Sequence, residues 1–160
     1  MKQVTVIKSL TAAAVLTLIS FVSSAQTPDP FVGTWVLNVA KSTFEPGPPL
    51  KSETTKITDA GNGAFHQVVD YVDGDGTATH LEFTSALDGK EVPVTGGSDA
   101  DTVTVTRPHP RTVRYVFKKA GKWTESGRFM VSKDGKTMTG SLHGIEAGAA
   151  WKYHYVLDRQ

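Results

Sequence analysis

The 160-residue sequence contains no cysteine, so no disulfide can stabilise the fold and the protein must rely on its hydrophobic core. It also lacks an excess of charge of either sign. Seventeen Lys and Arg residues stand against sixteen Asp and Glu residues, which gives a formal net charge of +1. Proteins that bind nucleic acid or anionic membrane surfaces need a strongly basic face. We therefore expect neither partner, and the composition indicates no particular oligomeric state.

Motifs of the common enzyme and metal-binding classes are absent as well. The chain has no Gly-x-Ser-x-Gly, no His-Glu-x-x-His and no phosphate-binding glycine loop, so we expect no cofactor. The acidic segment 73–76 lacks the later glutamate of a calcium loop and is interpreted as a hairpin turn. Four histidines have no zinc-site spacing, are predicted to face solvent, and indicate no metal site. They are His66, His80, His143 and His154.

The N-terminal segment has the three parts of a signal peptide. Lys2 and Lys8 supply the basic start, an apolar run covers residues 10–22, and Ser-Ser-Ala completes a cleavage site. The apolar run is shorter than the ~20 residues that span a bilayer. We therefore predict a signal peptide over residues 1–25 and a mature domain over 26–160 with no membrane span, exported to the periplasm or the medium.

The rest of the chain is rich in turn formers, with 15 glycines and eight prolines in the whole sequence. Turn signals recur at the spacing of roughly 8–12 residues that is typical of small all-β domains. The stretch from Asn38 to Leu50 holds Glu-Pro-Gly-Pro-Pro and is predicted to form neither regular strand nor helix. The turn signals are Gly61–Gly63, Asp73–Gly76, Asp88–Gly89, Pro108–Pro110, Ala120–Gly121, Asp134–Gly135 and Ala147–Gly148.

Alternating side chains divide the expected strands into an apolar, aromatic face and a charged face. This pattern predicts a single up-and-down antiparallel β-barrel of about 8–10 strands, and a two-sheet β-sandwich is the alternative. The residues predicted to face inward are Trp35, Leu37, Phe65, Gln67, Val69, Tyr71, Leu81, Phe83, Val103, Val105, Val113, Tyr115, Phe117, Trp123, Glu125, Gly127, Phe129, Val131, Met138, Gly140, Leu142, Trp151, Tyr153, Tyr155 and Leu157.

Polar groups on the inward face are the candidates for holding a ligand, because binding pockets combine apolar walls with a few orienting polar atoms. Glu125 is the most informative of them, since a buried carboxylate needs a hydrogen bond or a raised pKa. A β-bulge near Gly127 would instead turn Glu125 to solvent. The candidate ligand-binding residues are Gln67, Tyr71, Tyr115, Glu125, Tyr153 and Tyr155.

The segment Phe31–Trp35 reads Phe-Val-Gly-Thr-Trp and resembles the entry motif of the calycin superfamily, which includes the lipocalins. The chain is also similar to secreted bacterial lipocalin-like proteins, which share this opening and an Asp-Gly-Lys-Thr-Met hairpin. The resemblance implies structural roles for Gly33, Trp35 and Arg159, with Arg159 packed over Trp35 through a cation–π contact. It also implies that the proline-rich stretch crosses the barrel mouth as a lid.

Three functions follow from these features. The first is a lipocalin-like barrel that binds a small apolar or amphipathic molecule. The second is a structural or interaction module whose barrel is filled by its own side chains, since small barrels can be packed solid. The third is an isomerase- or hydratase-like enzyme that uses the interior carboxylate of Glu125 for proton transfer.

Overall fold

The computed structural model describes residues 28–97 and 99–160, and the predicted signal peptide over 1–25 lies outside them. The described chain is all-β, with one short 3-10 turn, η1 (Val39–Lys41). Its strands are β1 (Gly33–Leu37), β2 (Thr43–Glu45), β3 (Ser52–Gly61), β4 (Ala64–Val72), β5 (Ala78–Ser85), β6 (Asp88–Pro93), β7 (Thr102–His109), β8 (Thr112–Lys119), β9 (Lys122–Val131), β10 (Thr137–Glu146) and β11 (Ala149–Arg159).

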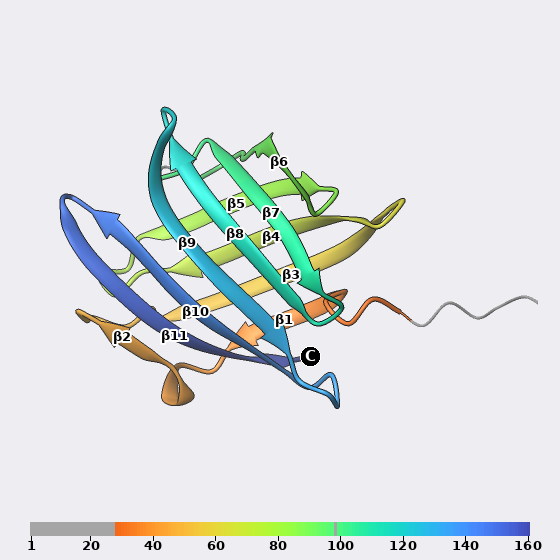
Figure 1. Ribbon diagram of the computed structural model, residues 1–160. Coiled ribbons are helices and arrows are strands. Elements are labelled where there is room, and N and C mark those ends of the chain that lie inside the picture. Colours follow the sequence, from red (N-terminus) through yellow and green to blue (C-terminus); the bar gives the residue numbers. More distant parts are fainter. Residues whose placement is uncertain (1–27, 98) are drawn as a thin grey trace, which may run out of the picture.

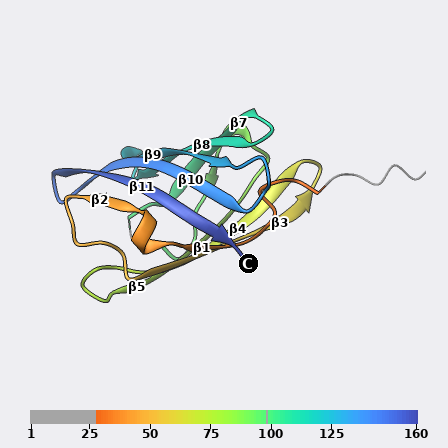
Figure 2. The same cartoon turned by 90° about the horizontal axis from the view of Figure 1, so that it is seen from below.

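The strands form one continuous antiparallel sheet in the order β5-β4-β3-β1-β11-β10-β9-β8-β7-β6 (Figure 1). Its two edges meet at a single bridge, in which the Glu82 and Thr95 backbones exchange hydrogen bonds of 2.9 and 3.0 Å. The predicted up-and-down barrel is therefore confirmed, and the sandwich alternative is wrong because the sheet is not split into two. Seen from below, β1 and the C-terminal end of β11 lie side by side (Figure 2).

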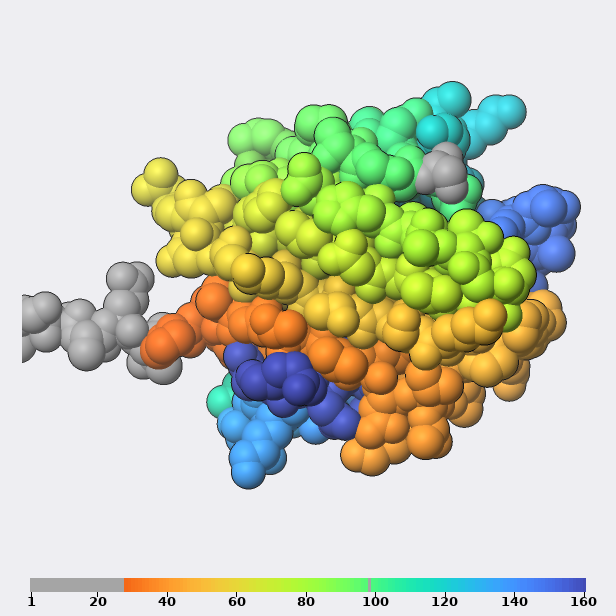
Figure 3. Space-filling view, turned by 180° about the vertical axis from the view of Figure 1, so that it is seen from behind, coloured from red at the N-terminus to blue at the C-terminus, as the bar shows by residue number. Residues whose placement is uncertain are grey.

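The up-and-down order gives the barrel two different ends. One end carries the β3–β4, β7–β8 and β9–β10 turns together with the segment before β1, and we call it the floor. The other end carries the β4–β5, β6–β7, β8–β9 and β10–β11 turns, and we call it the mouth. Between them the outer wall of β3, β4 and β5 presents the face seen in Figure 3.

The floor is built around Trp35, which is fully buried and donates its indole N–H to the Phe31 carbonyl at 2.9 Å. Arg159, paired with Trp35 across β1 and β11, lies with its guanidinium carbon 4.1 Å from the Trp35 ring centroid. Gly33 has φ +146°, and a Cβ there would lie 2.4 Å from an Arg159 nitrogen. Gly33 is therefore required by both its backbone conformation and the guanidinium beside it.

The proline-rich stretch is more ordered than the sequence predicts. The expectation that Asn38–Leu50 holds no regular structure is wrong, because η1 forms there and β2 pairs with β11. Phe44 of β2 packs on Tyr153, with ring centroids 5.0 Å apart. The prolines themselves lie at the mouth, where Pro48 packs so closely against Gly74 that a Cβ on Gly74 would lie 2.4 Å away.

One inward position is predicted wrongly, and a β-bulge explains the error. Phe117 pairs with Glu125 but the next β8 residue, Lys118, pairs with Trp123, so β9 carries one extra residue, Thr124. The extra residue turns Trp123 outward, where it is 39% exposed and packs on His143 with ring centroids 5.8 Å apart. Because the bulge precedes Glu125 rather than following it near Gly127, Glu125 keeps its inward orientation.

Candidate ligand cavity

The barrel encloses a cavity of about 400 Å³ above the floor. Its deep wall is formed by buried apolar side chains such as Ile57, Phe65 and Phe83. Towards the mouth, Leu50 from the proline-rich stretch and Trp151 from β11 complete the lining. A barrel with this volume is not filled by its own side chains, and pockets for small molecules start near ~300 Å³.

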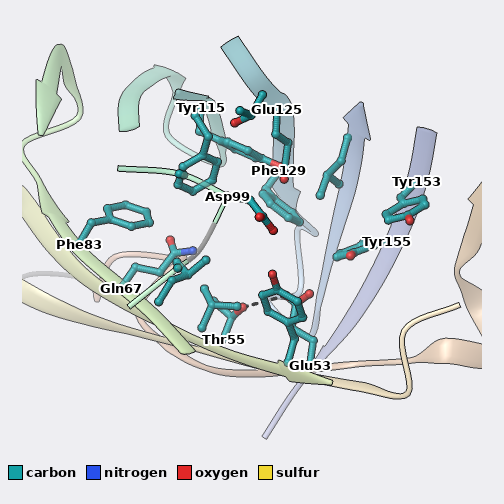
Figure 4. Close-up of a pocket in the computed structure, with 18 of the residues that line it drawn as sticks. Glu53, Thr55, Gln67, Phe83, Asp99, Tyr115, Glu125, Phe129, Tyr153 and Tyr155 are labelled. Atoms are coloured by element: carbon teal, nitrogen blue, oxygen red, sulfur yellow. Dashed lines mark hydrogen bonds between the residues drawn. The ribbon is translucent and has the colours of Figure 1, made fainter. Parts of the chain in front are cut away.

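All six residues that the sequence singles out for ligand binding lie on this cavity wall, contributed by β4, β8, β9 and β11. Figure 4 labels all of them except Tyr71, arranged around one space. Alternation places them there, because each shares the inward face of its strand with buried apolar neighbours. They are Gln67, Tyr71, Tyr115, Glu125, Tyr153 and Tyr155.

Glu125 and Tyr115 form a hydrogen-bonded pair on the β8–β9 side of the cavity. The Tyr115 hydroxyl donates to a Glu125 carboxylate oxygen. Burial raises the pKa of Glu125 to about 7, although the Tyr115 hydrogen bond lowers it, and the Asp99 charge raises it further. Burial and the Glu125 charge raise the pKa of Tyr115 well above its ordinary value, so its hydroxyl stays a donor.

Gly127 allows this pair to form. It faces inward on β9 opposite Tyr115, and a Cβ at Gly127 would lie 2.7 Å from the Tyr115 hydroxyl oxygen. The absence of a side chain therefore lets the phenol ring lie flat along β9, with its hydroxyl at Glu125. The ring stacks on Phe129 at a centroid distance of 5.8 Å, so this side of the cavity is aromatic as well as acidic.

A second carboxylate, Glu53 on β3, lies on the cavity wall and is absent from the sequence-based candidates. It is only 6% exposed and accepts a 3.0 Å hydrogen bond from the Thr55 hydroxyl. Burial raises the pKa of Glu53 to about 7, and the Glu125 charge contributes to the increase. The sequence feature that could have indicated an inward-facing Glu53 is its alternation with Thr55 and Ile57. Two of these three residues are polar, so the segment does not resemble a strand with a core-facing side.

Aromatic side chains of β11 cover the cavity between these carboxylates. Tyr153 stacks on Trp151 at 4.5 Å and on Tyr155 at 6.0 Å between ring centroids. Burial raises the pKa of Tyr155 far above the range of a solvated phenol. On β4, burial likewise raises the pKa of Tyr71 to about 12. The tyrosines therefore present neutral hydroxyl groups to the cavity at physiological pH.

Further charged side chains border the mouth, again mostly carboxylates. Asp73 follows β4, Asp99 lies between β6 and β7, and Glu146 ends β10. Figure 4 shows the Asp99 side chain directed into the same space as Glu53 and Glu125. Neither Asp73 nor Asp99 was expected to line the cavity, because only the closed barrel brings these loops over it.

Histidines and acidic side chains do not assemble a metal site within residues 28–97 and 99–160: no group of three or more potential ligands is close enough to hold an ion. Two of the four histidines instead contact single acidic neighbours on the outer wall. His80 bonds to Asp70 at 2.6 Å, and His66 lies 3.5 Å from Glu82. The segment from Asp73 to Thr77 forms the β4–β5 hairpin turn, closed by a 2.9 Å backbone hydrogen bond.

Comparison with known proteins identifies the fold. No family model matches the chain. No curated protein matches it either. Two solved structures are similar over 82% of this chain. EF1p2_mFAP2b, solved bound to DFHBI, has 16% identity and a TM-score of 0.51 over 94% of its length. Rv2717c from M. tuberculosis has 13% identity and a TM-score of 0.52 over 93% of its length.

These likenesses, at such low identity, concern architecture alone. Together with the cavity they define the class of the protein, which is an antiparallel up-and-down β-barrel with a hollow, acidic and aromatic interior. Among the described residues no helix is long and apolar enough to cross a membrane.

Proposed function

We propose that this protein is an exported, lipocalin-like barrel that binds a small apolar or amphipathic molecule in its cavity. The observation that carries the proposal is the cavity of about 400 Å³. That volume lies within the range of roughly 300–1,000 Å³ found for small-molecule sites. Its wall also has the composition of such sites, with mostly apolar side chains and a few polar atoms that can orient a ligand.

Two further observations support the proposal. The similar structure of EF1p2_mFAP2b was solved with DFHBI bound, so this architecture is compatible with holding a small molecule. The packing of Arg159 over Trp35, with Gly33 leaving the space, agrees with the resemblance to the lipocalins. The ligand of the similar structure does not identify the ligand here.

Export is proposed from the basic start, apolar run and small residues of the N-terminal segment 1–25. The test is expression of the full chain in a bacterium, followed by fractionation and N-terminal sequencing. Export predicts a periplasmic or secreted protein that begins at Gln26. A cytoplasmic protein that retains residues 1–25 would show that the proposal is wrong.

Ligand binding is testable with the fluorescent apolar probe N-phenyl-1-naphthylamine and two variants that differ by one residue position. Val69 faces the cavity and Val68 is its outward neighbour on β4. Val69→Phe fills part of the cavity and should weaken probe binding about tenfold or more, whereas Val68→Phe should leave binding unchanged. No binding to the unmodified protein, or equal binding to both variants, would contradict the proposal.

A second candidate is proton-transfer catalysis by Glu125, favoured because burial raises the pKa of this carboxyl to about 7, near the working pH of a general acid or base. A catalytic Glu125 would accelerate exchange of the methyl protons of 2-acetylnaphthalene with D₂O, which NMR measures. Glu125→Gln should abolish the acceleration. An exchange rate equal to that of buffer alone, or one unaffected by the substitution, would rule out this candidate.

A further inference from the structure

The charged side chains around the cavity are almost all acidic. Five carboxylates line it, three from strands and two from loops, whereas Lys119 at the end of β8 is the sole basic residue on its described wall. The chain as a whole is nearly neutral, so this imbalance is local. The five carboxylates belong to Glu53, Asp73, Asp99, Glu125 and Glu146.

The two deepest carboxylates approach the cavity from different walls. Glu53 lies on β3 and Glu125 on β9, and the sheet places β1, β11 and β10 between those two strands. Their side chains therefore flank the enclosed volume rather than pairing with each other, as Figure 4 shows. A ligand in the cavity meets a carboxylate on both sides.

Each of these carboxylates has a single hydrogen-bond donor among the described residues, and the donor is neutral. Thr55 donates to Glu53, and Tyr115 donates to Glu125. A buried carboxylate normally has a cation or several donors, because one neutral hydrogen bond does not replace its lost hydration. The described side chains of the wall thus leave part of the acceptor capacity of Glu53 and Glu125 unused.

Aromatic rings on the same wall also favour a cationic ligand. Tyr115, Phe129 and Tyr155 line the cavity, with the Phe129 ring 5.8 Å from Tyr115 and 6.5 Å from Tyr155 between centroids. The face of an aromatic ring attracts a cation and repels an anion. The rings also supply an apolar surface for the body of a ligand.

We infer that the cavity selects a protonated organic amine with an apolar or aromatic body over neutral and anionic molecules of the same shape. The ammonium group would be held between the carboxylates of Glu53 and Glu125, while the body contacts the aromatic wall. This inference rests on the proposed function, because it specifies the ligand of the same cavity. A free fatty acid is the opposite case, since its carboxylate would face five others.

The preference of the cavity for a protonated amine should increase as pH rises. At low pH the two deep carboxyls are protonated, and because burial raises their pKa values to about 7, they ionise between about pH 6 and 8. An amine that remains protonated over this interval should therefore bind more tightly at pH 8 than at pH 6. The other titratable groups facing them from the surrounding elements are Tyr71, Asp73, Asp99, Tyr115, Lys119, Glu146, Tyr153 and Tyr155.

The test is displacement of N-phenyl-1-naphthylamine by three molecules that differ only in their head group. These are 1-naphthylmethylamine, 1-naphthalenemethanol and 1-naphthoate. We expect the amine to compete about tenfold better than the alcohol at pH 8, and the naphthoate to compete least. In the double variant Glu53→Gln, Glu125→Gln, amine and alcohol should compete equally, with alcohol affinity unchanged. Glu82→Gln, on the outer wall, is the control and should keep the amine preference.

The outcomes separate this inference from the function on which it rests. Equal competition by all three molecules, or strongest competition by naphthoate, would overturn the inference and leave ligand binding intact. An amine preference that persists in the double variant would also overturn it, because the preference would then have another origin. Failure of N-phenyl-1-naphthylamine itself to bind would contradict the proposed function as well.

Discussion

The floor of this barrel holds the half-buried charge of Arg159 and the cavity holds the buried carboxyl group of Glu53, and their surroundings differ. At the floor, Arg159 donates to the carbonyl oxygens of Gly135, Val32 and Pro30 at 2.6, 2.7 and 2.5 Å. It also packs on the ring of Trp35. The hydrogen bonds of Arg159 are therefore all made within the chain, and they connect the segment before β1, the β9–β10 turn and β11.

In the cavity, by contrast, Glu53 is 6% exposed but receives one hydrogen bond, from its neighbour Thr55. Its surroundings raise its pKa instead of supplying a cation. The comparison shows that one barrel can satisfy a half-buried charge with its own carbonyl oxygens at one end and leave a charge available for a ligand at the other. The floor should therefore govern unfolding, and the cavity should govern binding and the response to pH.

The largest effect is expected from removing the floor's central side chain. Trp35→Ala should lower the free energy of unfolding by about 4 kcal/mol, because it leaves a large cavity in the fully buried floor. Trp123→Ala is the matched control, since Trp123 is 39% exposed, and it should cost about 1 kcal/mol or less. Urea unfolding followed by circular dichroism measures both. Equal losses of unfolding free energy in the two variants would show that the floor does not contribute more to stability than an exposed position.

The next effect is a loss of stability as pH rises, which originates in the cavity. Burial raises the pKa of Glu53 from its ordinary 4.5 to about 7, so the folded state binds this proton more tightly than the unfolded state. The stabilisation is complete below pH 4.5 and is lost as pH rises to about 7. A shift of this size corresponds to about 3 kcal/mol. Urea unfolding at pH 5 and pH 8 should show the loss in the unmodified protein and a smaller loss in Glu53→Gln.

A more moderate effect is expected from Arg159→Lys, which keeps the floor's charge but not its planar fork. One ammonium group cannot reach all three carbonyl oxygens, so the variant should lose about 2 kcal/mol of unfolding free energy. Binding of N-phenyl-1-naphthylamine to the folded variant should be unchanged. Weaker binding of the probe to the fully folded variant would show that the floor and the cavity are not independent.

The smallest effect is expected at Gly127, within the cavity. In Gly127→Ala the new methyl group displaces the Tyr115 hydroxyl from Glu125, since a Cβ there would lie 2.7 Å from the hydroxyl oxygen. We expect a loss of about 1 kcal/mol of unfolding free energy and about fivefold weaker binding of 1-naphthylmethylamine. The control is Ser126→Ala on the outer face, which should change neither quantity. Unaltered amine binding in Gly127→Ala would mean that Tyr115 does not position Glu125.

Much of the architecture was predictable because alternation and turn signals are local properties of the sequence. They place Tyr115, Glu125 and Tyr155 on the cavity wall, and the resemblance to the calycins places Arg159 over Trp35. The Thr124 bulge was not predictable in position, because one extra residue leaves no distinct signal and reverses every side chain on one side of it.

The remaining site residues depend on closure rather than on local pattern. Asp99 belongs to a loop, and its position at the cavity results from the β6–β7 connection passing over the mouth. Glu53 alternates with Thr55 and Ile57, but it is placed on the interior face only when β3 is paired between β1 and β4. Long-range pairing therefore determines that the interior is acidic, and no window of a few residues contains that information.

The single bridge that closes the barrel, between Glu82 of β5 and Thr95 just after β6, also has a dynamic consequence. Elsewhere around the barrel each strand is held by a ladder of several residue pairs, for example ten between β10 and β11. Local opening needs least free energy where the fewest hydrogen bonds break. The amide hydrogens of Glu82 and Thr95 should therefore exchange with deuterium much faster than those of β10. The Glu82–Thr95 bridge would then be the place where the barrel opens first.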